Sequence, residues 1–125
     1  MGKTILLIED NEHNRYLATY MLDRRGFRVV SASNGAEGIA LARAEAPALV
    51  LLDIQLPGMN GYDVARALRH HAGLQQVPII AVTSCAMAGD REKALEAGCT
   101  GYIEKPIDPG TFVMDIEAFL PQEPS

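Results

Sequence analysis

The sequence has no tryptophan, only two cysteines and no long hydrophobic run. Because Cys85 and Cys99 are too few for a disulfide framework, we expect both to be free thiols in a reducing compartment. The apolar runs are far shorter than the about 20 residues that a membrane-spanning helix needs. The first predicted strand begins at Thr4, so we expect no signal peptide ahead of it. These observations predict a cytoplasmic protein with no membrane partner.

Positive charge is also scarce, because 11 lysines and arginines face 16 acidic residues and give a net charge of −5. This balance argues against a nucleic-acid-binding surface. The composition is 48% hydrophobic and 22% charged, which is typical of a globular protein. We therefore expect one domain over residues 1–125, with a core at about 4–120 and a frayed tail at 121–125.

Five apolar, β-branched runs alternate with five patterns that favour helices. The strands are predicted at residues 4–9, 28–33, 48–53, 78–83 and 101–104. The helices are predicted at about residues 12–25, 35–45, 61–71, 88–97 and 109–120. In the first helix, the apolar side is expected to contain Leu17, Tyr20, Met21 and Leu22. Asp108-Pro109 is expected to open the last helix as its N-cap and first residue.

Regular alternation of strands and helices with short connections predicts a parallel sheet covered by helices on both faces. The central strands are continuously apolar, as strands buried on both faces must be. We therefore predict an α/β, flavodoxin-like, doubly wound sheet of five strands in the order 2-1-3-4-5. In this fold, ligands bind at the carboxyl ends of the first and third strands, where the strand order reverses.

Acidic residues end both of these strands: Glu9 and Asp10 follow the first, and Asp53 closes the third. A single acid in this place is often a helix cap or a solvated loop residue. Three carboxylates together repel one another, by roughly 4 kcal/mol per close pair at an effective dielectric constant near 20. A site of oxygen ligands suits Mg²⁺ better than Zn²⁺, and the backbone carbonyl of Gln55 could add a further ligand. The strand ends therefore predict a magnesium site.

The other two strands end in groups that complement the acids. Thr83 and Ser84 place two hydroxyls at the same sheet edge, and Lys105 follows the last strand. An ammonium and a hydroxyl facing a metal-bound carboxylate describe a site for a tetrahedral oxyanion such as phosphate. A cis Lys105–Pro106 peptide bond would direct the lysine inward.

The chain resembles the receiver domain of bacterial two-component response regulators over about residues 4–120. The motifs that carry this resemblance are Glu9-Asp10-Asn11, residues 53–61, Thr83-Ser84 and residues 102–107. Within the family, the sequence looks most like stand-alone DivK-type regulators and the receiver modules of hybrid kinases. The resemblance implies a phosphorylation-activated switch in a two-component system or phosphorelay.

The family pattern implies a role for each residue of the predicted site. Asp53 would be the phosphoacceptor, taking the phosphoryl group from a phosphohistidine on a partner protein. Glu9, Asp10 and Asp53 would hold Mg²⁺ together with the Gln55 carbonyl, and Lys105 would bind a phosphoryl oxygen. The donor would be a histidine kinase or a histidine phosphotransfer protein.

The resemblance also implies how the signal leaves the site. Thr83 would move toward the phosphoryl group, Tyr102 would rotate inward, and the small Ser84 would leave access to the phosphoryl group. A downstream protein would bind the face formed by the fourth helix, the fifth strand and the fifth helix. Such a domain would lose its phosphoryl group by slow autodephosphorylation and would not be an enzyme with an external substrate.

Three alternatives remain at this point. A phosphohydrolase of the haloacid dehalogenase class would need a second aspartate where this chain has Gln55, and its cap insertion is missing. A flavodoxin-like flavin- or nucleotide-binding module would need a phosphate loop where the acidic residues 9–12 would repel phosphate. A degenerate receiver would bind partners without phosphorylation, although every expected site position is filled.

Overall fold

The computed structural model describes residues 3–56, 58–83, 89–105, 108 and 110–120. Its strands are β1 (Thr4–Ile8), β2 (Arg28–Ala32), β3 (Leu49–Asp53), β4 (Ile79–Thr83) and β5 (Gly101–Glu104). Its helices are α1 (Glu12–Arg24), α2 (Gly35–Glu45), α3 (Gly61–His70), α4 (Asp90–Glu96) and α5 (Phe112–Phe119), with a short 3₁₀ helix η1 (Ala72–Leu74). Within the described residues, none of these helices is long and apolar enough to span a membrane.

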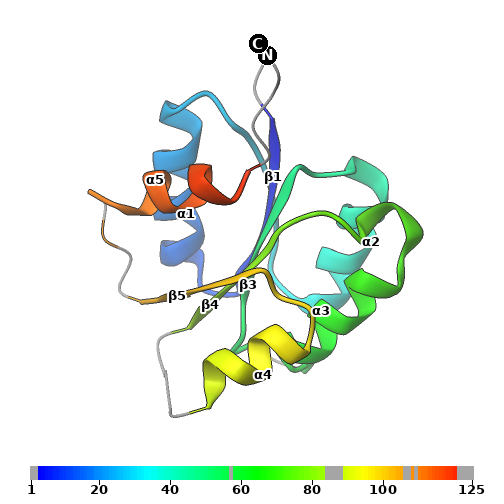
Figure 1. Cartoon of the computed structure of the whole chain (residues 1–125). Helices are drawn as coiled ribbons and strands as arrows, with labels where there is room; N and C mark the ends of the chain where they lie inside the picture. Colours follow the sequence, from blue (N-terminus) through cyan, green and yellow to red (C-terminus); the bar gives the residue numbers. More distant parts are fainter. Residues whose placement is uncertain (1–2, 57, 84–88, 106–107, 109, 121–125) are drawn as a thin grey trace.

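The strands form one parallel sheet in the order β2-β1-β3-β4-β5, which confirms the predicted topology. Helices α1 and α5 lie on one side of the sheet, and α2, α3 and α4 lie on the other (Figure 1). Ile8 of β1 pairs with Leu52 of β3, and Thr83 of β4 pairs with Glu104 of β5. This register brings the carboxyl ends of the four strands β1, β3, β4 and β5 to one edge.

Two hydrophobic clusters hold the helices against the sheet. Alternate residues of β1 point to opposite faces: Leu6 and Ile8 join the cluster on the α2, α3 and α4 side, whereas Ile5 and Leu7 join the other. Fully burying one such side chain contributes roughly 1.5–3 kcal/mol to folding. The sheet is therefore a well-packed platform for the loops at its edge.

Asparagine side chains fix where the first three helices begin. Asn11 accepts a hydrogen bond from the Asn14 N–H (2.9 Å), Asn34 from the Glu37 N–H (2.8 Å), and Asn60 from the N–H two residues on (2.7 Å). Such caps satisfy donors that the first turn of a helix leaves unpaired. These helices accordingly begin at the predicted residues, and their last residues lie within one residue of the predicted positions.

The predicted starts of the last two helices were wrong. Helix α5 begins at Phe112, because the Asp108 side chain accepts the Gly110 N–H (2.8 Å) and holds a turn ahead of the helix. Helix α4 begins at Asp90, because Gly89 has a φ of +90°, outside the helical region. Pro109 and Ala88, with which the two predicted helices began, lie outside the described residues.

The predicted apolar side of α1 was right for Leu22, which is buried, and for Met21, which packs against the core, but wrong for Leu17 and Tyr20. Ala18 and Leu22, four residues apart, form the buried side, while Leu17 is 42% and Tyr20 is 50% exposed. At 100° per residue, these two residues project to a different side of the helix from Ala18 and Leu22. Helix α1 consequently presents large apolar side chains to solvent.

Arg69 of α3 joins loops at the opposite edge of the sheet. Its guanidinium donates hydrogen bonds to the carbonyls of Leu74 (2.8 Å), Val77 (2.6 Å) and Gly98 (2.8 Å), and to the Thr100 hydroxyl (3.1 Å). Carbonyl groups of loops need such donors when they are removed from water. Arg69 thus fixes the loops that lead into β4 and β5.

Candidate functional site

The three predicted carboxylates lie together at the ends of β1 and β3. One oxygen from each of Glu9, Asp10 and Asp53 can be chosen so that all lie within 4.8 Å of one another. Glu9 and Asp53 are each only 4% exposed, whereas Asp10 faces solvent. The pairing of β1 with β3 therefore creates an acidic cluster with one open side.

Lys105 partly compensates the negative charge of this cluster. Its Nζ lies 2.6 Å from Glu9 Oε1 and 3.5 Å from Asp53 Oδ2, and its side chain is 11% exposed. Backbone donors contribute as well, because the Gln55 N–H binds Asp53 Oδ1 at 2.9 Å and the Asn11 N–H binds Glu9 Oε2 at 3.3 Å. The cluster is thus held in place by hydrogen bonds from two loops and one lysine.

Burial raises the pKa of Asp53 from 3.8 to about 7, and a hydrogen bond with Glu9 adds to the effect. Burial also acts to raise the pKa of Glu9, but its hydrogen bonds with Asp53 and Lys105 outweigh burial and lower that pKa. Two carboxylates this close cannot both be ionised cheaply. At pH values below about 7 and without a cation, the pair consequently holds a proton, which a bound divalent cation would displace.

The donor set of the cluster fits a hard divalent cation. The three side chains offer only carboxylate oxygens, which Mg²⁺ prefers over the nitrogen and sulfur ligands typical of Zn²⁺ sites. Gln55, whose carbonyl is the fourth predicted ligand, follows two residues after Asp53, and its N–H is bound to the Asp53 carboxylate. The short loop after β3 therefore lies directly against the acidic cluster.

The remaining predicted residues lie at the ends of β4 and β5. Thr83 is buried, and its carbonyl accepts the Lys105 N–H at 2.7 Å, which joins the two strand ends. Tyr102 lies on β5 and packs against the cluster on the α4 side of the sheet. Ser84 and the Lys105–Pro106 peptide bond fall on positions outside the described residues.

Sequence reasoning missed Arg15, which supports the acidic loop from α1. Its Nη1 donates to the carbonyls of Glu9 (2.9 Å) and Asp10 (3.1 Å). These two hydrogen bonds hold the loop backbone and leave the carboxylates of Glu9 and Asp10 available. The position of Arg15 one turn into the helix that follows the acids was the signal that could have revealed it.

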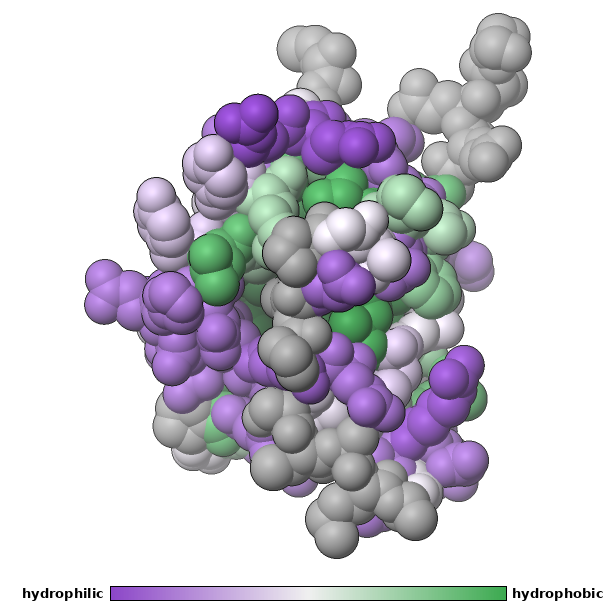
Figure 2. Space-filling model, turned by 90° about the vertical axis from the view of Figure 1, so that its left-hand side faces the viewer, coloured by the Kyte–Doolittle hydropathy of each residue, from purple (hydrophilic) through white to green (hydrophobic). Residues whose placement is uncertain are grey.

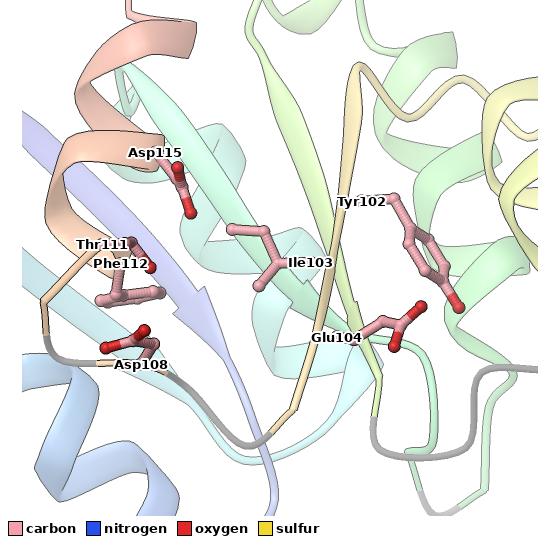
Figure 3. A pocket seen from close by; sticks show the side chains of 7 residues that line it. All are labelled: Tyr102, Ile103, Glu104, Asp108, Thr111, Phe112 and Asp115. Atoms are coloured by element: carbon pink, nitrogen blue, oxygen red, sulfur yellow. The ribbon is translucent and has the colours of Figure 1, made fainter.

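A separate cavity of about 280 Å³ lies between β5 and α5. It is lined by Tyr102, Ile103, Glu104, Asp108, Thr111, Phe112 and Asp115. The Ile103 side chain points toward α5, whereas Tyr102 and Glu104 point to the other side of the strand (Figure 3). The two sides of β5 thus lead to different surroundings, one next to α5 and one next to α4.

The sequence matches the family described as "Response regulator receiver domain" over residues 5–117. It is 39% identical over 120 residues to the polar-differentiation response regulator DivK of Brucella anthropi. The aligned region covers 96% of this chain and 98% of the Brucella protein.

Solved structures show the same architecture. The receiver domain of the sensor histidine kinase PA1611 from Pseudomonas aeruginosa, with a magnesium ion coordinated in its active-site cleft, superimposes with a TM-score of 0.87 at 34% identity. That comparison covers 95% of this chain and 98% of the other. The chemotaxis protein CheY4 of Vibrio cholerae has a TM-score of 0.92 over 96% of this chain and 100% of its own, and at 23% identity it supports the fold alone.

Proposed function

Because the chain belongs to the response regulator receiver family and is a phosphorylation-activated switch, we propose that Asp53 is its phosphoacceptor. The observation that carries this assignment is the placement of Asp53 against both the acidic cluster and Lys105. An Asp53 oxygen attacks the phosphorus of a phosphohistidine on the donor protein. The P–N bond breaks, the imidazole nitrogen leaves with the electron pair, and an aspartyl phosphate forms.

Glu9, Asp10, Asp53 and the Gln55 carbonyl are the proposed ligands of Mg²⁺. When bound, the cation supplies positive charge that offsets the charge of the transferring group and its acidic surroundings. Two findings support this assignment: the oxygen-only donor set of this chain, and the magnesium ion in the related PA1611 domain.

Lys105 is proposed to bind an oxygen of the transferred phosphoryl group. In the resting site its ammonium lies nearer to Glu9 than to Asp53, at 2.6 Å against 3.5 Å. An added phosphoryl group on Asp53 would compete with Glu9 for this ammonium. Lysine suits this task because its charge is compact and its stem is flexible.

Thr83 and Tyr102 are proposed to carry the signal away from Asp53. Thr83 lies on β4, which pairs with β3, and Tyr102 lies on β5, the next strand beyond β4. Thr83 ends its strand at the edge that holds the acidic cluster. A downstream protein is proposed to bind the face of α4, β5 and α5, which holds Tyr102 and the acidic β5–α5 cavity. The phosphoryl group is then lost by slow autodephosphorylation, without turnover of an external substrate.

The phosphodonor, a histidine kinase or histidine phosphotransfer protein, is proposed to dock on the solvent side of α1. This surface combines Tyr16, Leu17 and Tyr20 with Met114 of α5, all large apolar side chains that are exposed. The two tyrosine rings stack with centroids 6.4 Å apart, and Arg24 lies over the second ring at 5.6 Å. Figure 2 views the molecule from the side of α1 and α5 and shows hydrophobic residues interspersed with hydrophilic ones.

The place of the α1 surface supports this docking site. Helix α1 begins directly after the acidic loop, so a protein bound along it can bring a histidine to Asp53. A cavity of about 420 Å³ between Tyr20, Met21 and Met114 could take a side chain of the donor. Exposed apolar surface of this kind is a common mark of a protein-binding site.

Incubation with Mg²⁺ and acetyl phosphate, followed by intact-mass measurement, tests the function. We expect a gain of one phosphoryl group that is lost in Asp53→Asn and kept in Asp63→Asn, which alters an exposed aspartate of α3. Failure of the wild-type protein to gain mass with acetyl phosphate or with a phosphorylated histidine donor would favour the degenerate receiver instead.

A further inference from the structure

Asp10 differs from the other two carboxylates of the acidic cluster in the way it is held. The Glu9 carboxylate accepts a hydrogen bond from the Lys105 ammonium at 2.6 Å, and the Asp53 carboxylate accepts the Gln55 N–H at 2.9 Å. The exposed Asp10 carboxylate, by contrast, has no hydrogen bond or ion pair within the described part of the chain. Its place in the cluster therefore depends on the backbone that carries it.

One side chain holds the backbone on both sides of Asp10. This residue lies in the loop between β1 and α1, where neither a strand nor a helix fixes its conformation. Arg15 Nη1 donates to the Glu9 carbonyl at 2.9 Å and to the Asp10 carbonyl at 3.1 Å. These carbonyls belong to the two planar peptide units that meet at the Asp10 Cα. Arg15 therefore fixes the direction of the Asp10 Cα–Cβ bond.

The Asp10 carboxylate has an alternative place beside α1. Asp10 directly precedes Asn11, whose side chain caps this helix. The first turn of a helix leaves backbone N–H groups unpaired, and a neighbouring aspartate can bind them. Rotation of the loop at Asp10 would turn its carboxylate from the cluster toward these donors. Arg15 opposes that rotation, because it would move the two carbonyls away from their shared nitrogen.

We propose that Arg15 is a positioning residue for the Mg²⁺ site, because its two backbone hydrogen bonds hold the Asp10 carboxylate toward Glu9 and Asp53. This role rests on the proposed function, since it concerns one ligand of the proposed Mg²⁺ site. It also has a sign that charge alone cannot produce. A guanidinium near a cation site repels Mg²⁺, so loss of its charge alone would strengthen Mg²⁺ binding. Loss of the positioning weakens that binding.

Arg15→Ala is expected to bind Mg²⁺ about tenfold more weakly, at the lower end of the effects seen when a residue that orients a metal ligand is removed. Arg15→Lys keeps the charge and a flexible donor, so it is expected to recover part of the loss. Arg43→Ala is the matched control, because it removes an exposed arginine from the last turn of α2. That turn leads to the start of β3, at the sheet edge opposite the cluster, so we expect an affinity within about twofold of wild type.

A double-mutant cycle tests whether the effect of Arg15 passes through Asp10. Calorimetric titration with Mg²⁺ at constant ionic strength compares wild type, Arg15→Ala, Asp10→Ala and the double variant, each as the full chain. In the Asp10→Ala background, Arg15→Ala is expected to cause no further loss of affinity. An equal loss in both backgrounds, or tighter Mg²⁺ binding by Arg15→Ala alone, would overturn the positioning role.

Backbone ¹⁵N relaxation of the metal-free protein provides a measurement that needs no Mg²⁺. Arg15→Ala is expected to lower the order parameter of the Asp10 amide and to leave that of the Gln55 amide, in the loop after β3, unchanged. An unchanged order parameter at Asp10 would overturn the positioning role. Failure of wild type to bind Mg²⁺ would instead contradict the proposed Mg²⁺ site, and the relaxation data would still decide whether Arg15 holds Asp10.

Discussion

Replacement of Asp53 by asparagine is expected to stabilise the metal-free protein at pH 8 and to have much less effect at pH 5. The folded protein raises the pKa of Asp53 from 3.8 to about 7. Between these values the folded state binds more protons than the unfolded state, so this group's contribution to stability falls as pH rises. Asparagine does not titrate, so the Asp53→Asn variant does not lose this stability as the pH rises.

The magnitude follows from the same pKa difference. At 1.36 kcal/mol per pH unit, the interval from 3.8 to about 7 corresponds to at most about 4 kcal/mol. The pKa of about 7 already includes the attraction of Lys105 to the ionised carboxylate. Because relaxation and water at the open side of the cluster reduce the cost of ionising a buried group, we expect about 2 kcal/mol of difference between the two proteins at pH 8. The carboxamide oxygen can still accept the Gln55 N–H, which limits other effects of the substitution.

The assay is urea unfolding with EDTA at pH 5 and pH 8, on wild type, Asp53→Asn and the exposed control Asp23→Asn. The control is expected to follow wild type at both values, which removes the general effect of net charge. Saturating Mg²⁺ should erase the advantage of Asp53→Asn, because the cation stabilises only the intact cluster. An equal difference at both pH values would refute the proposed sharing of a proton between Asp53 and its neighbour.

Three further predictions follow from the same contacts. Mg²⁺ affinity, measured by calorimetry, is expected to rise between pH 6 and pH 8 because the Asp53 proton must leave; a flat profile would contradict this. Arg69→Ala is expected to cost about 3 kcal/mol in urea unfolding by leaving loop carbonyls without donors, whereas the exposed, ion-paired Arg66→Ala costs less than about 1 kcal/mol. Gly61→Ala is expected to cost about 2 kcal/mol or more, because its Cβ would meet Ile54 backbone at 2.5 Å; the control Gly73→Ala, with no contact closer than 3.8 Å, is expected to have little effect.

The strand-end cluster could be predicted from the sequence because few residues determine it. Continuously apolar strands in regular alternation with helices leave few possible sheet topologies, and strand ends then share one edge. Glu9, Asp53 and Lys105 each lie within a residue of a strand end, so an error of one residue in a boundary does not separate them. Their convergence therefore followed from the topology alone.

Features that depend on packing or on local competition could not be predicted in this way. The orientation of α1 is set by which side fits the sheet, and the small Ala18 is buried while the larger Tyr20 is not. The start of α5 depends on which backbone N–H the Asp108 side chain binds. The same carboxylate can cap a helix or hold a turn ahead of it, so the sequence alone does not decide between the two.

Borohydride trapping tests whether Asp53 itself carries the phosphoryl group. Borohydride reduces an aspartyl phosphate to homoserine, which peptide mass spectrometry can locate in the chain. After treatment with Mg²⁺ and a phosphodonor, we expect homoserine at position 53 and nowhere else. Homoserine at Asp10, or an unmodified Asp53 in protein that has gained a phosphoryl group, would contradict this expectation.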